Sequence, residues 1–245
     1  MESPVQSDGI EPLESDGGGS GIQSVWGVLL APESTFRSLA ARPRWFPAFL
    51  LLFLSAVGLS LILMPRMDMK QVIRDAVEKQ GQEISETKLD SQVRLAKIVG
   101  TASQVVVQPA FYLILASVFL VVFRLSGSEI DFRRSLSVTV HGMLPVVVAS
   151  LLTIPILLTR TKISMDEAKS GSFLPSNLGF LATESTGKAL HSLLSSCDIF
   201  SLWAIALLAI GFRIVGRVST GVAWGVVLTL WALAIGAKAF LGSLY

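Results

Sequence analysis

The residues best suited to chemistry lie within or beside long apolar runs of this sequence. Six stand out: Asp198, His141, Gln104, Gln108, Pro145 and Trp203. A carboxylate and an imidazole could exchange protons, and amide side chains could coordinate a polar substrate. A proline frees a backbone carbonyl by interrupting the helical hydrogen bonds. Ionisable groups at membrane depth are functional hypotheses by default, so their positions along the chain must be examined first.

Asp198 opens the run SSCDIFSLWAIALLAIGF. There it can cap the positive end of a helix, while Arg213 and Arg217 lie at the opposite, negative end. A catalytic pair of Asp198 with His141 is not expected, because their predicted helices run antiparallel and place the two at opposite membrane faces. We interpret Asp198 as a helix cap and a topology marker.

The motifs of common enzymes and metal sites are missing. The sequence has no HExxH, no GxSxG and no phosphate-binding glycine loop. Its two histidines are far apart and its single cysteine forms no cluster with zinc-ligand spacing. We therefore expect a protein that is not an enzyme and uses no cofactor or metal.

A polar stripe runs along the second apolar segment. Thr101, Gln104, Gln108 and Tyr112 follow helical spacing and share one face. Hydrogen bonds between helices are the favoured interpretation, and a transport path is the alternative. In the third segment, His141 is expected to bond to another helix near the cytoplasmic end, with Pro145 and Pro155 as two interruptions of the backbone ladder.

The composition defines the class of protein. Of the 245 residues, 51% are hydrophobic and 16% are charged, and the mean hydropathy is +0.63. A water-soluble domain of this length could not bury so much apolar surface. The net charge is +2 without a clustered basic face, which excludes a nucleic-acid binder. We predict an all-α, polytopic membrane protein.

Apolar runs of about 20 residues predict five transmembrane helices. They cover about residues 45–64, 99–123, 137–158, 197–212 and 221–241. The fourth is short, and the last two form an antiparallel pair. In the fifth, Gly221, Gly225, Thr229, Ala232 and Gly236 form a small-residue face that would let another helix pack closely.

The remaining segments are more polar. Residues 1–22 carry acids and no base, which predicts a disordered tail. Before the first span, Pro32 and Glu33 suit the first turn of a short amphipathic helix in the membrane interface, with Phe36 and Leu39 on its apolar face. Residues 65–98 predict a solvated helical segment that breaks near Gly81 and continues into the second span.

Arginine placement predicts the orientation. The short connections RLSGSEIDFRR and RIVGRVST hold five arginines and two acids. Because basic residues in short loops favour the cytoplasm, we place both connections there. The amino terminus is then cytoplasmic, residues 65–98 are extracytoplasmic, and Tyr245 lies outside.

Three stretches resemble the Yip domain family, the Ypt/Rab-interacting integral membrane proteins, in its bacterial form. They are LLAPESTFRSLAARPRWFPAFLL, SVTVHGMLPVVV and DIFSLWAIALLAIGFRIV, and the resemblance covers about residues 23–241. The family pattern touches Pro32, Phe36, Pro145, Asp198, Trp203 and Gly211. It implies five spans with a cytoplasmic amino terminus. The DLYGP-type motif of eukaryotic members is missing, which argues against binding of Rab-type GTPases.

These observations predict a non-enzymatic scaffold or partner-binding protein of the cell membrane. Its expected contacts are the lipid bilayer and a membrane or cytoplasmic protein, with a homo-oligomer as one possibility and nucleic acid excluded. The alternative is a small transporter or lipid-moving protein that uses Gln104, Gln108 and Asp198.

Overall fold

The computed structural model describes residues 21–81, 83–164 and 197–243, together with residues 167, 173, 174, 176, 187, 190 and 194. Of the predicted tail, residues 1–22, the first 20 lie outside this set, and the last two, Gly21 and Ile22, open the first helix. The named elements in the described ranges are all α-helices: α1 (Gly21–Leu30), α2 (Pro32–Ala41), α3 (Phe46–Arg66), α4 (Met69–Glu78), α5 (Glu86–Leu125), α6 (Phe132–Gly142), α7 (Pro145–Thr159), α10 (Ile199–Val215) and α11 (Thr220–Ser243).

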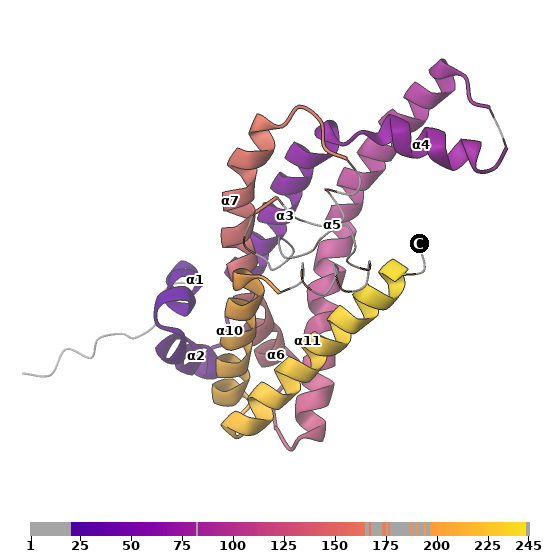
Figure 1. The fold of residues 1–245 in the computed structure, drawn as a ribbon. Helices are drawn as coiled ribbons and strands as arrows, with labels where there is room; N and C mark the ends of the chain where they lie inside the picture. Colours follow the sequence, from indigo (N-terminus) through magenta and orange to yellow (C-terminus); the bar gives the residue numbers. More distant parts are fainter. Residues whose placement is uncertain are drawn as a thin grey trace, which may run out of the picture.

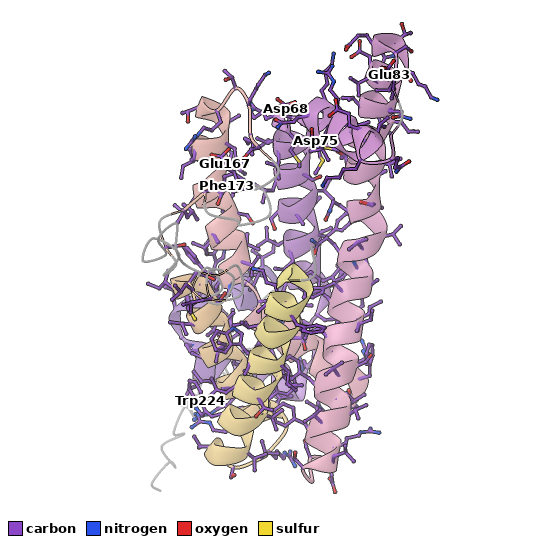
Figure 2. The ribbon with its side chains drawn as sticks, turned by 45° about the vertical axis from the view of Figure 1, so that its right-hand side comes forward. Asp68, Asp75, Glu83, Glu167, Phe173 and Trp224 are labelled. Atoms are coloured by element: carbon purple, nitrogen blue, oxygen red, sulfur yellow. The ribbon has the colours of Figure 1, made fainter. Side chains whose placement is uncertain are left out.

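Helices α3, α5, α6, α7 and α10 form an upright bundle (Figure 1). Helix α3 packs against α5 and α7, whereas α10 contacts α2, α6, α7 and α11. Helix α4 lies at one end of the bundle, and Figure 2 shows Asp68, Asp75 and Glu83 there, with Trp224 toward the other end. The central core contains a cluster of aromatic rings. The ring centroid of Phe212 in α10 lies 4.3 Å from that of Phe123, on which it stacks, and 4.7 Å from that of Phe119, both in α5.

Within the part of the chain that the structure describes, four segments are long and apolar enough to cross a membrane: α3, α5, α6 together with α7, and α11 as far as Phe240. Helix α10 is apolar but has only 17 residues, which is at the lower limit of about 17–25 for a span. The structure therefore supports a multi-pass membrane protein, and the fifth span stays a prediction.

The third span is not a single helix. It begins at Phe132, where Asp131 caps α6 by accepting a hydrogen bond from the backbone N of Arg134 at 2.9 Å. It is then interrupted at Met143 and Leu144 before Pro145 starts α7. The interruption at Pro145 is confirmed. Pro155 lies inside helix α7, which continues past it, so its missing backbone N–H removes one hydrogen bond of the ladder without ending the helix.

The segment between the first two spans has the predicted form. Helix α4 ends before Gly81, whose φ of +67° is a turn conformation suited to glycine. Helix α5 then begins at Glu86 and runs without interruption into the second apolar segment, although Pro109 lies inside it.

The amphipathic helix before the first span is present as α2, but its apolar face lies elsewhere than expected. Phe36 and Leu39 are fully buried in the protein core, where α2 packs against α10. We expected this face to contact the membrane interface. It contacts protein because an additional helix, α1, precedes α2 and the two dock together beside α10 (Figure 1).

Candidate functional site

Asp198 caps its own helix. One carboxylate oxygen, Oδ1, accepts hydrogen bonds from the backbone N of Phe200 at 2.9 Å and of Ser201 at 3.0 Å. The other oxygen accepts a hydrogen bond from the Ser201 hydroxyl. These are the unpaired donors of a helix start, so the predicted cap is confirmed. Arg213 lies in the last turn of the same helix, as expected.

His141 is fully buried at the end of α6 and joins two helices. Its Nδ1 lies 2.8 Å from the carbonyl oxygen of Ser137, and its Nε2 lies 3.1 Å from Oγ of Ser24 in α1. The predicted interhelical hydrogen bond is therefore confirmed. Along the helix, His141 lies nine residues, or about 14 Å, from the start of α6 at Phe132.

The two glutamines of the polar stripe bond to each other. Nε2 of Gln108 donates to Oε1 of Gln104 at 3.3 Å, one turn away on α5. This bond lies within one helix, whereas we expected bonds between helices. Thr101, Gln104 and Gln108 are partly buried. At the end of the stripe Tyr112 is buried, and its ring centroid lies 6.4 Å from that of Phe49 in α3.

Pro145 and Trp203 have structural positions. Pro145 is the first residue of α7, where a missing backbone N–H costs no hydrogen bond. Trp203 is partly buried and packs against the core cluster. Neither residue contributes a reactive group.

The six candidate residues do not converge on one site. The two glutamines bond to each other, and His141 and Asp198 each have other hydrogen-bond partners. None of them lines the clefts that contain Arg44, Arg94 or Arg134. Among the described residues, no group of three His, Cys, Asp or Glu side chains lies close enough to hold a metal ion.

Two contacts that involve α1 and α2 were not predicted from the sequence. Ser24 pairs with His141, and Glu33 accepts a 2.6 Å hydrogen bond from Nη2 of Arg213 in α10. Each joins residues more than a hundred positions apart. The amphipathic pattern of α2 indicates a docked helix, but it carries no signal for the partner.

The small-residue face of α11 is open. A methyl group added at Gly221, Gly225 or Gly236 would meet no described atom within 4 Å. Thr229 and Ala232 on the same face are exposed. By contrast, Gly142 and Gly211 are crowded, since a Cβ would lie 2.6 Å from Leu208 and 2.7 Å from Val138. The glycines of α6 and α10 thus serve packing inside the bundle, and those of α11 do not.

An all-helical bundle with several membrane-length apolar helices defines a multi-pass integral membrane protein. The family model of the Yip1 domain matches residues 26–241. The chain therefore belongs to the Yip1 domain family. It is also 22% identical over 221 residues to "Membrane protein YknW" of Bacillus subtilis (strain 168), with 89% of this chain and 90% of that protein covered. No solved structure matches the chain significantly.

Proposed function

We propose that this protein is a non-enzymatic scaffold of the cell membrane that binds another membrane protein through α11. The observation that carries the proposal is the open face of Gly221, Gly225, Thr229, Ala232 and Gly236. In a bilayer, apolar side chains gain little by leaving lipid, so helices associate mainly by close packing. A row of small residues permits such packing, and α11 turns this row away from the rest of the described chain.

The attachment of α11 supports the same role. Its contacts are mainly with α10, and its buried residues Ala223 and Val227 lie on the side opposite the small-residue face. One side of α11 therefore holds it in the bundle, and another side is free to receive a partner helix. The partner could be a different membrane protein or a second copy of this chain.

The polar residues of the spans also favour binding over transport. Gln104 and Gln108 bond to each other, and Asp198 uses its oxygens to cap α10. A transporter that used Gln108 and Asp198 together would need them to line one path, but their hydrogen bonds go to separate partners.

The test is crosslinking in native membranes with two matched variants, Ala232→Leu and Ala234→Leu. Both alanines are exposed on α11, and both substitutions add the same volume. They differ by about 200° around the helix, so only Ala232 belongs to the small-residue face. We expect Ala232→Leu to lose the crosslinked partner and Ala234→Leu to keep it, at equal abundance.

Co-expression of two differently tagged copies shows whether the lost product is a homo-oligomer. Retention of every crosslinked product by Ala232→Leu at normal abundance would contradict the proposal.

A further inference from the structure

A shallow cleft of about 480 Å³ lies where the connection between α2 and α3 meets the start of α6. The connection contributes Pro43, Arg44 and Trp45, α3 contributes Phe46 and Pro47, and α6 contributes Arg133, with Gly21 of α1 beside them. Among the described residues, the lining holds two guanidinium groups and no carboxylate. It is therefore positively charged from two separate elements.

Arg44 and Arg133 have free donors. Neither forms a hydrogen bond or an ion pair with another described residue. Their neighbours differ, because Arg134 pairs with Asp131 at 2.8 Å and Arg213 pairs with Glu33 at 2.6 Å. Planar guanidinium groups with unused N–H donors suit bidentate recognition of a phosphate.

The cleft opens onto an apolar face of α3. Phe46, Leu50 and Leu54 follow at intervals of four residues, so they share one side of the helix, and all three are exposed. Trp45 lies at the start of this face with its ring edge-on to Phe46 at 5.7 Å. Tryptophan at the end of a membrane-length helix is typical of the headgroup level.

We propose that this cleft binds an anionic phospholipid, with the phosphate between Arg44 and Arg133 and an acyl chain along Phe46, Leu50 and Leu54. The charge selects an anionic headgroup, and the exposed apolar face supplies a surface that free phosphate would not use. This binding site is independent of the partner face on α11.

Two other clefts fit this ligand less well. The one lined by Arg134 and Arg217 also contains Glu129, and its Arg134 is already paired with Asp131. The one beside α5 is lined by Glu86 and Asp90 as well as Arg94. Carboxylates in both would repel a phosphate.

The experiment measures lipid binding to the purified full-length protein in a neutral detergent, by native mass spectrometry and by the shift in the unfolding midpoint. The probes are phosphatidylglycerol, phosphatidylcholine and inorganic phosphate. The test variant is R44Q/R133Q. The control is R42Q/R217Q, which removes the same charge from two exposed arginines outside this cleft.

We expect the test variant to bind phosphatidylglycerol about 25-fold more weakly than the unmodified protein, because each of the two arginines contributes about a factor of five. The control should stay within about twofold, since neither of its arginines lines the cleft and charges that are exposed to water are screened by salt. Phosphatidylcholine and inorganic phosphate should bind much more weakly than phosphatidylglycerol.

Three results would overturn the proposal. Equal losses in both double variants would indicate a diffuse charge effect, and unchanged binding in R44Q/R133Q would exclude the cleft. Protection by inorganic phosphate equal to that by phosphatidylglycerol would make this an ion site without a lipid. The unfolding midpoint of each variant, measured without added lipid, shows whether that variant is folded. If R44Q/R133Q fails to fold, R133Q alone is measured in the same way, because Arg133 is exposed.

Discussion

Nε2 of His141 and Oγ of Ser24 lie 3.1 Å apart although the two residues are 117 positions apart in the chain. This contact fixes α1 to the interior of the third span. A carbonyl oxygen only accepts, so the Nδ1 that lies 2.8 Å from the Ser137 oxygen carries the proton. In the neutral ring Nε2 is then an acceptor, and the single proton of the Ser24 hydroxyl has two acceptors within reach, Nε2 at 3.1 Å and the Gly21 carbonyl oxygen at 2.6 Å.

We expect Ser24→Ala to destabilise the protein by about 1–3 kcal/mol, because Nε2 of the buried His141 loses its partner. Ser34→Ala is the control. Ser34 is exposed and bonds only to a backbone oxygen of its own turn, so its loss should stay within about 0.5 kcal/mol. Unfolding midpoints in detergent measure both. Equal effects would show that the contact with His141 adds nothing.

Phe212→Ala should cause a larger loss. The Phe212 side chain is fully buried and stacks on Phe123 with the ring planes 16° apart. Its removal leaves a cavity between α5 and α10, with a cost of up to about 3–5 kcal/mol. Phe111→Ala, at a half-exposed position of α5, should cost less than about 1 kcal/mol. A loss at Phe212 no greater than that at Phe111 would refute a packed ring core.

A comparison of Asp198→Asn with Asp198→Ala distinguishes the capping role of Asp198 from a role of its negative charge. The amide oxygen of Asn still accepts the backbone bonds of Phe200 and Ser201, so Asn should behave nearly as Asp does. Alanine cannot accept them and should cost about 1 kcal/mol. Abundance and unfolding midpoint give this comparison. If Asp198→Asn kept normal abundance but abolished a flux in vesicles, the scaffold function would be wrong and the transporter alternative would be favoured.

The orientation predicted from the arginines is tested by labelling single cysteines in intact cells. In a Cys197→Ser background, Lys79→Cys should react with a membrane-impermeant maleimide, and Ser126→Cys should be protected. Both positions are exposed, so accessibility within the protein does not distinguish them. The opposite pattern would place residues 65–98 in the cytoplasm.

The contact between α4 and α5 should depend on pH at the alkaline end. The hydrogen bond of Lys70 to Asp90 and the charge of that carboxylate raise the pKa of Lys70 above 10.5. A lysine whose pKa is raised by folding stabilises the folded form fully below its ordinary pKa and loses that effect as the pH rises through the raised value.

The distance between spin labels at Gln71→Cys and Ser91→Cys should therefore be constant from neutral pH to about pH 10 and lengthen above it. Lys70→Gln should lengthen it at all pH values. High salt should weaken the contact too, because the pair is exposed. If the distance between the labels changes neither at high pH nor with Lys70→Gln, apolar contacts alone hold α4 against α5.

The sequence predicts the spans well because a bilayer imposes a long apolar run on any helix that crosses it. The ends of α3, α10 and α11 fall within a few residues of the predicted positions. The start of the third span was placed five residues too late, because FRRS reads as a polar connection. The cap supplied by Asp131 makes those residues helical.

The contacts around α1 and α2 could not be predicted in the same way. Ser24 with His141 and Glu33 with Arg213 depend on how distant helices pack, and one sequence has no pattern that links such positions. The bond between Gln104 and Gln108 was missed for a local reason. Their spacing of four residues allows a contact along one helix as well as between two, and the first is formed.

Helix α5 has 40 residues, so it is about 60 Å long, twice the hydrocarbon thickness of a bilayer of about 30 Å. Its predicted span covers residues 99–123, so the thirteen residues before that span, about 20 Å of helix, lie outside the hydrocarbon. Because the helix is continuous, this segment is a rigid spacer, and α4 is braced against it by Lys70 and Arg74. Any molecule that docks on α4 is held at a set height above the lipid surface, beyond the reach of most headgroup charge.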